Sequence, residues 1–368
     1  MIPVLYPPEE EEFEFGALGW LTDALSCKAT EETETGACYL EITYPVDGNH
    51  YSDIAIGCQI KTASDPATVQ VYCIDRIDYS AAGTIDIYAP QRTLLRMQKT
   101  VLLVKTRESD DGSEPPSYTN RSARNMMLAM AADALPKPID SESDLQDVEF
   151  ISDITYSSGS EVTVELDDYP TMFDALIAAA KIFNGEIKWG INSVSILRSR
   201  GVDSGLEIRY GLNMLALDAE ADAGDYATTI LPVARGYTGQ AISLDTTRGF
   251  PFHRGAVVDV SDYWGTGMTI QDAAQAYLEA QGIRPSIKVE FDPNDLPNVD
   301  ADPERIRNLY LCDTVTVVHK GLQLKEKAKI SKVVFDSLLL RYESLDVGEI
   351  QQNITDTIAA LIRGNKKG

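Results

Sequence analysis

The residues of this chain that could do chemistry are few, and their spacing favours structural roles. His253 lies in the glycine-bounded segment 249–255 and could act as a general base, but the sequence places no nucleophile beside it. The acidic stretch 292–304 offers calcium-like oxygens. It lacks the glycine that an EF-hand loop requires, and its prolines suit a stiff connector. We therefore predict no catalytic residue and no metal ligand.

Common catalytic and nucleotide-binding signatures are missing from the sequence. It contains no GxSxG, HExxH, P-loop or GxGxxG pattern, and the Gly-Thr-Gly at 265–267 is interpreted as a turn. Carboxylate pairs such as 110–111 and 167–168 recur throughout an acidic chain, so they do not indicate glycoside cleavage. The run of four glutamates at 9–12 is interpreted as a solvated segment, because a linear run does not converge its oxygens on one ion.

The cysteines stand singly, with no CxxC pair. They are Cys27, Cys38, Cys58, Cys73 and Cys312. An odd number at scattered spacing predicts buried, reduced thiols in a protein assembled in the cytoplasm. Only His50, His253 and His319 could complete a zinc site with them, so we predict no zinc and no cofactor.

Length and charge set the broad class of the protein. A chain of 368 residues with 44% hydrophobic and 24% charged residues is an ordinary globular sequence, long enough for several domains. Its net charge of −25 argues against tight binding to a phosphate backbone, although solubility alone also explains such a charge. The first residues lack the features of a signal peptide, and no window reaches 18 uninterrupted apolar residues, so we predict no stable membrane insertion.

Hydrophobic periodicity divides the chain into β-rich ends and a mixed middle. Short strands separated by turn signals cover residues 1–100, including 38–44 and a long strand at 69–79. Residues 108–118 have the composition of a linker. Strands at 161–166, 185–189 and 193–197, together with two helices, predict an α+β block.

Three internal helices have recognisable start signals. The first is predicted over 120–135 with Thr119 as its N-cap, and its methionines Met126, Met127 and Met130 are interpreted as core filler. The second is predicted over 172–184 with Thr171 as the cap. The third is predicted over 270–280, capped by Thr269 with Asp272 and ended by Gly282.

The β-pattern returns at residue 205 and ends in three successive strands. They are predicted at 313–319, 323–335 and 338–345, joined by turns at 320–321 and 336–337. Three strands alone expose two edges and an apolar face, so we expect them to close a barrel or sandwich begun about a hundred residues earlier. An amphipathic helix is predicted over 350–362, where it would dock on a neighbour or lead into another module.

The predicted fold class is α+β and multidomain, with two antiparallel β-barrel domains and α+β domains between and inserted. The boundaries are 1–106 for the first barrel, 107–204 for the α+β domain, 205–262 with 309–349 for the second barrel, 263–308 for a helix-containing insertion and 350–368 for a C-terminal helix or tail.

Several segments, taken in order, resemble the tail-associated hub proteins of siphophages and prophages, often labelled prophage endopeptidase tail or minor structural proteins. The segments are LSCKATEE (25–32) with GACYLEITYP (36–45), QVYCIDR (70–76) with GTIDIYA (83–89), RGVDSGLEIRYGLN (200–213), TILPVARG (229–236), and DTVTV (313–317) through FDSLLLRYESLDVG (335–348). Each segment is weak alone, and their order and spacing carry the resemblance.

The resemblance implies a fold similar to the baseplate hub of contractile-tail phages, with two tube-type barrels. It further implies a homotrimeric ring that joins the distal tail protein to tip or fibre proteins, contacts the tape measure protein and passes DNA without binding it specifically. The implied location is the tail tip of the virion, after assembly in the host cytoplasm. Because residues 351–368 are too few for a catalytic domain, we do not expect an enzyme.

Two other classes of function stay open at this point. One is a carbohydrate-binding or other assembly module, which a platform of Trp20, Trp189 and Trp264 supports poorly. The other is a peptidoglycan-degrading tail enzyme with a site that the sequence does not reveal.

Overall fold

A computed structural model describes most of the chain and divides it into two compact units. The described residues are 1–33, 35–109, 112–135, 145–159, 161–209, 214–220, 226–234, 237–247, 249–260, 269–280, 286–291, 309–319 and 324–347. The first unit comprises Met1–Ala216, Val289–Val318 and Lys327–Gly348, and the second comprises Leu217–Lys288, His319–Glu326 and Glu349–Gly368.

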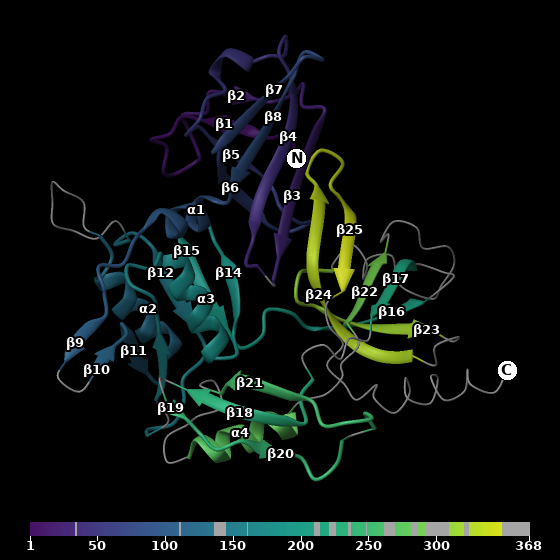
Figure 1. Cartoon of the computed structure of the whole chain (residues 1–368). Coiled ribbons are helices and arrows are strands. Elements are labelled where there is room, and N and C mark those ends of the chain that lie inside the picture. Colours follow the sequence, from purple (N-terminus) through teal and green to yellow (C-terminus); the bar gives the residue numbers. More distant parts are fainter. Residues whose placement is uncertain are drawn as a thin grey trace. The chain divides into compact units, whose positions relative to one another are not determined.

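The chain is mostly β-sheet, with four α-helices among the described residues, which agrees with the α+β class. Its largest sheet has ten strands, in the order β17-β22-β25-β24-β3-β4-β8-β7, and β16 and β23 continue it from β24 (Figure 1). The strands are β3 (Ser26–Glu32), β4 (Cys38–Pro45), β7 (Arg76–Ser80), β8 (Thr84–Pro90), β16 (Asp203–Arg209), β17 (Met214–Glu220), β22 (Ser286–Phe291), β23 (Thr314–His319), β24 (Leu324–Asp336) and β25 (Arg341–Val347).

Strict alternation of side chains explains how β4 sits in this sheet. Cys38, Leu40, Ile42 and Tyr44 are buried, whereas the residues between them are half-buried or exposed. A period of two places every second side chain on one face, so this face packs into the core and the other meets solvent. The strand predicted over 38–44 is therefore confirmed.

The last strands of the chain pair with the first ones. β24 runs antiparallel to β3, with Val333 opposite Glu31 and Phe335 opposite Ala29. A salt bridge of 2.7 Å between Lys28 and Glu343 joins residues 315 positions apart. The terminal strands thus have partners at two places in the chain. β23 pairs in parallel with β16, about a hundred residues earlier as the sequence suggested, whereas β24 pairs with β3 near the beginning of the chain.

Among the residues that the structure describes, no sheet closes into a barrel. The ten-stranded sheet is open, and β7 forms one of its edges, paired only with β8. The coarse class is therefore confirmed, while the two predicted barrels are not seen. The predicted domain boundaries remain a prediction.

A second, four-stranded sheet of the first unit has the order β2-β1-β5-β6. Its strands are β1 (Val4–Tyr6), β2 (Gly19–Trp20), β5 (Gln59–Ala63) and β6 (Val69–Cys73), and a 3-10 turn, η1 (Tyr51–Asp53), precedes β5. Helix α1 (Arg92–Lys99) follows β8, and the Gln91 side chain caps it by accepting a hydrogen bond from Leu94 N at 2.8 Å. Glutamine is not among the preferred capping residues, which explains why this helix was missed.

The middle of the first unit is an α+β block in which β15 lies between β12 and β14. The elements are β9 (Arg107–Ser109), β10 (Gly112–Glu114), β11 (Ser117–Asn120), α2 (Ala123–Ala132), β12 (Glu149–Ser152), β13 (Val162–Glu165), α3 (Met172–Ile182), β14 (Glu186–Trp189) and β15 (Ser193–Leu197). One hydrophobic cluster extends from Leu5 through this block to Ile196. The cluster includes the fully buried Met126, Met127 and Met130, as predicted.

The second unit is a small two-layer structure. β18 (Thr229–Ala234) pairs with β19 (Tyr237–Thr238), β20 (Ile242–Ser243) and β21 (Gly255–Asp259), and α4 (Ile270–Ala280) belongs to the same unit. Ile230 and Ala234 of β18 pack with Ala273, Ala274 and Leu278 of the helix. None of the described helices is long and apolar enough to cross a bilayer.

The helix start signals were right in two cases and wrong in one. Thr171 and Asp174 form a reciprocal capping box at α3, and Thr269 pairs with Asp272 in the same way before α4. For α2 the cap is Ser122, whose Oγ accepts from Asn125 N at 3.4 Å. Thr119 instead lies in β11, because the chain stays extended to pair with β13.

Three other local predictions need correction. The single strand predicted over 69–79 is two strands, β6 and β7, which belong to different sheets. The predicted linker at 108–118 includes the β9–β10 hairpin. The strand expected from Leu338 begins at Arg341, because residues 337–340 form a turn.

Several predicted features lie outside the described residues. They are the turns at 320–321 and 265–267, the helix end at Gly282, the carboxylate pair at 110–111, most of the acidic stretch and the helix at 350–362.

Replacing Thr171 with alanine removes the hydroxyl that accepts Asp174 N at 3.1 Å. We expect the free energy of unfolding to fall by about 1 kcal/mol. Thr119→Ala is the control, because its hydroxyl makes only an exposed contact with Thr163 at 2.8 Å and should cost less than about 0.5 kcal/mol. Urea unfolding followed by circular dichroism measures both, and equal losses would contradict the capping assignment.

Candidate functional site

The histidines of the described chain have structural surroundings. His253 Nδ1 lies 3.2 Å from the hydroxyl of Thr228, which also accepts from Arg254 N at 2.8 Å. His50 precedes η1, and its Nδ1 lies 3.0 Å from a carboxylate oxygen of Asp53, the last residue of η1. The Thr228 hydroxyl is a potential nucleophile, but Thr228 is fully buried and its hydroxyl accepts the Arg254 amide. The structural interpretation of His253 stays a prediction. The side chain of His319 is outside the described residues.

The five cysteines are free, and all but Cys73 are buried. Burial raises the pKa of Cys27 and Cys312 to about 12 and that of Cys73 to about 11. A thiol with a raised pKa is a poor nucleophile at neutral pH. Within the described residues, no three histidine, cysteine or acidic side chains gather in a way that could hold a metal ion.

The acidic run at 9–12 has a local structural role. Glu10 accepts hydrogen bonds from Glu12 N and Phe13 N, each at 3.0 Å, whereas Glu9, Glu11 and Glu12 are exposed. The carboxylate of Glu10 thus shapes the turn that buries Phe13.

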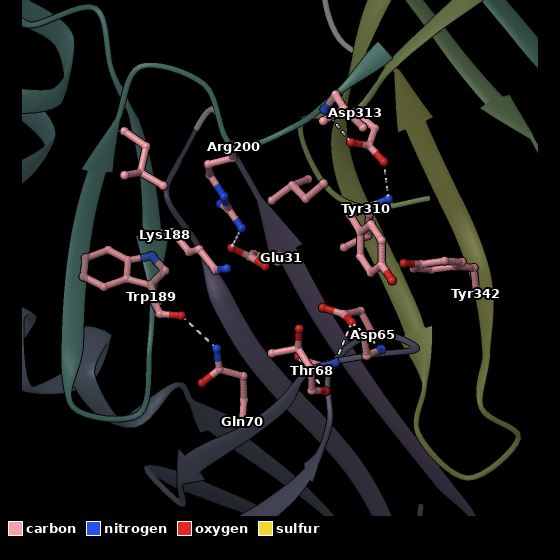
Figure 2. A pocket seen from close by; sticks show the side chains of 16 residues that line it. Glu31, Asp65, Thr68, Gln70, Lys188, Trp189, Arg200, Tyr310, Asp313 and Tyr342 are labelled. Atoms are coloured by element: carbon pink, nitrogen blue, oxygen red, sulfur yellow. Dashed lines mark hydrogen bonds and ion pairs between the residues drawn. The ribbon is translucent and has the colours of Figure 1, made fainter. Parts of the chain in front are cut away.

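A cavity of about 470 Å³ lies where the α+β block, the start of the chain and the terminal strands meet within the first unit (Figure 2). We call it the junction pocket. Its lining residues are Glu31, Ser64, Asp65, Ala67, Thr68, Gln70, Lys188, Trp189, Leu197, Arg200, Val202, Tyr310, Leu311, Asp313, Val333 and Tyr342. They come from β3, the β5–β6 turn, β6, β14, β15, the connection from β15 to β16, the segment before β23, β24 and β25. The site therefore exists only in the folded chain.

Arg200 is the central polar contact of the junction pocket. Its Nη2 lies 2.8 Å from Glu31 Oε1, and the side chains of Arg200 and Glu31 are only 10% and 23% exposed. Arg200 Nη1 donates to Ile187 O at 2.6 Å. Burial acts to lower the pKa of the guanidinium, but Glu31, Cys312 and Cys38 together raise the pKa above its ordinary value. The pair therefore ties the α+β block to β3 as a charged contact.

Gly201, which follows Arg200, permits a very close approach between its backbone and that of Cys312. A Cβ atom on Gly201 would lie 2.1 Å from Cys312 O, closer than any side chain can come. Cys312 itself has a φ of 73°, in the left-handed region that is costly for a residue other than glycine. The surrounding contacts stabilise this conformation.

Asp313 supplies the main contacts that hold this approach in place. Its buried carboxylate accepts Val202 N at 2.8 Å through Oδ1 and Tyr310 N at 2.9 Å through Oδ2. Two backbone donors on one carboxylate make strong, charge-assisted hydrogen bonds. Asp313 thus connects the segment that leaves β15 to the segment that enters β23.

A buried amide network forms another wall of the junction pocket. Gln70 Nε2 donates to Trp189 O at 2.8 Å, and Gln91 Nε2 donates to Gln70 Oε1 at 3.2 Å and to Gly190 O at 2.8 Å. The Trp189 indole N–H donates to Gly36 O at 3.0 Å. Trp189 is therefore a core residue and does not offer its ring as a sugar platform.

Several polar side chains of the junction pocket are engaged in contacts that connect parts of the fold. Ser64 also lines the pocket, and its hydroxyl donates to Thr68 O at 3.4 Å. The lining groups that could contact a ligand include the ammonium of Lys188, the carboxylate of Asp65 and the hydroxyl of Tyr310 (Figure 2). These groups can pair with a polar ligand.

Sequence reasoning did not predict the junction pocket. Arg200 and Gly201 appear in a segment that resembles the tail family, but no local pattern links them to Glu31 or Cys312. The sequence signal for this site was limited to Gly201 directly after Arg200, close to the predicted domain boundary at residue 204.

Comparison with known proteins finds similar folds. No protein-family model and no curated protein matches the chain. The prophage tail protein gp18 of Listeria monocytogenes EGD-e has a TM-score of 0.59 at 11% identity, covering 100% of both chains. The 43 kDa tail protein of prophage MuSo2 from Shewanella oneidensis has a TM-score of 0.57 at 11% identity, covering 95% of this chain and 98% of that one.

A tail protein from Neisseria meningitidis MC58 is similar to the same extent. Its TM-score is 0.54 at 9% identity, with 95% of this chain and 96% of that chain covered. At such identities the likeness shows a shared fold, and it extends over nearly the whole chain. The sequence resemblance to tail proteins is thus supported at the level of the fold.

Replacing Arg200 with methionine leaves the half-buried Glu31 without its ion-pair partner. We expect the free energy of unfolding to fall by about 3 kcal/mol, because a half-buried carboxylate loses its charge-assisted contact. The control is Arg76→Met, since Arg76 and Asp78 are each 63% exposed and their pair should contribute less than about 1 kcal/mol. Denaturant unfolding measures both, and a loss below 1 kcal/mol for Arg200→Met would contradict a structural role for the pair.

Replacing Gly201 with alanine forces its Cβ against the backbone of Cys312. Neither backbone can move without breaking the hydrogen bonds of Asp313, so we expect a loss of about 2 to 3 kcal/mol in the free energy of unfolding. The neighbouring Ser199→Ala is the control, because Ser199 is exposed and makes only a 3.2 Å bond to Gly201 O. Similar stabilities for the two variants would show that the close approach is not tight.

Proposed function

We propose that this chain is a structural hub of a phage or prophage tail tip. The observation that carries the proposal is the fold, which three tail proteins share along 95 to 100% of this chain. The sequence segments that resemble tail-associated hub proteins, and their order along the chain, support the same function. In this proposal the chain acts by assembly and not as an enzyme.

The proposed assembly is a homotrimeric ring at the tail tip of the virion. The ring joins the distal tail protein to tip or fibre proteins, with the tape measure protein as a further contact. Three copies of the chain around a threefold axis would present a repeating surface to the neighbouring tail proteins. Open edges such as β7 favour this arrangement, because unpaired strand edges are sites where another chain can add.

The net charge of −25 agrees with a ring through which DNA passes. A negatively charged lumen repels phosphates, so the genome would move through without binding specifically.

The two alternative functions have weaker support. A carbohydrate-binding module needs exposed aromatic platforms, and of the tryptophans in the described residues Trp20 is 56% exposed while Trp189 is buried. A wall-degrading enzyme needs a nucleophile or an acid–base pair, for which no geometry stands out among the described residues. Zymography on purified cell walls and glycan-array binding separate these alternatives from the hub.

The solution mass tests the proposal. Light scattering after size exclusion, over a range of concentration and salt, should give a trimer near three times 40.4 kDa. A stable dimer would contradict the ring, because twofold symmetry does not build one. A monomer at all concentrations would favour a binding module.

A further inference from the structure

One wall of the junction pocket carries a fixed negative charge. Asp65 Oδ1 accepts Ala67 N at 2.8 Å and Thr68 N at 2.7 Å, so the β5–β6 turn holds the carboxylate in one orientation. The side chain is half-buried, and Figure 2 shows it directed toward the space below Tyr310. Screening by water is weaker there than on an open surface, so the charge of Asp65 acts across the pocket.

Two tyrosines stand next to this carboxylate. The Tyr342 hydroxyl donates to Leu309 O, and its ring packs edge-on against Phe335 at 5.3 Å between centroids. The backbone of Tyr310 is held by Asp313. Burial, and after it the charges of Asp65 and Asp313, raise the pKa of Tyr310. Tyrosine rings attract cations through their π-systems.

The positive groups of the pocket differ in their availability. Arg200 is committed to Glu31. Lys188 is exposed, reaches toward Glu31 in Figure 2, and has no ion-pair partner in the described part of the chain. An ammonium at this position competes with any positive ligand and would attract a negative one. Its effect therefore distinguishes a cation site from an anion site.

We propose that the junction pocket binds a positively charged side chain, arginine or lysine, from a partner protein. Asp65 supplies the countercharge, and the rings of Tyr310 and Tyr342 form the wall along which the cation lies. The volume of about 470 Å³ is within the range of small-ligand pockets and exceeds what one side chain needs. The inference rests on the proposed function only for the identity of the partner, which would be another tail protein.

The test uses N-acetyl-arginine N-methylamide as the probe and the matching citrulline compound as its neutral isostere. Saturation-transfer difference NMR on the full chain gives the dissociation constants and works for a monomer or a trimer alike. We expect the arginine probe to bind roughly tenfold more tightly than the citrulline probe, because only arginine carries the charge. Equal affinities would overturn the proposal.

Two substitutions should change the affinity in opposite directions. Asp65→Asn removes the charge but keeps an oxygen that can accept Ala67 N and Thr68 N, so the turn survives; binding should weaken roughly three- to tenfold. Lys188→Gln removes the competing ammonium and should strengthen binding by a few fold. Glu41→Gln, on the exposed side of β4 outside the pocket, should leave the affinity unchanged.

Circular dichroism unfolding curves confirm that each variant folds. An unchanged affinity in Asp65→Asn, or a weaker affinity in Lys188→Gln, would overturn the cation site. Because the probe reports binding and not assembly, its outcome is independent of the oligomeric state, and each proposal can fail without the other.

Discussion

The antiparallel pairing of β3 with β24 is the constraint on which the rest of the structure depends. It joins strands from the two ends of the chain, so β16, β17, β22, β23 and β25 belong to the same sheet as β4, β7 and β8. Closing such a long loop costs conformational entropy before any contact forms. The fully buried Phe335 and the hydrogen bonds of the buried Ser337 to Cys27 and Ala63 help to offset that cost at the end of β24.

Polar contacts then set how the α+β block joins this sheet. An apolar interface alone would tolerate small sliding movements, whereas the Arg200–Glu31 pair and the Asp313 carboxylate need specific distances and angles. Gly201 allows the backbone approach that these contacts require. The junction pocket is the space left where these groups meet, so its walls are fixed by contacts that also hold the fold together.

The sequence predicted features that depend on neighbours along the chain and failed where distant contacts decide. The alternation in β4 and the capping box at Thr171 are local, and both are confirmed. Thr119 has the right type for a cap, yet pairing with β13 keeps it in a strand. The junction pocket could not be predicted, because Arg200 meets Glu31 only after β24 has paired with β3. The barrels were inferred from strand spacing, which does not determine whether a sheet closes.

We infer that β3 and β24, which lie far apart in the sequence, belong to one cooperative sheet. Native-state hydrogen exchange tests it most directly, through the backbone amides of Ala29 and Glu31 in β3 and of Val333 and Phe335 in β24. We expect protected amides in both strands to exchange through the same opening, with equal free energies and equal dependence on denaturant. Exchange of β24 at a clearly lower free energy, while β3 stays protected, would contradict it.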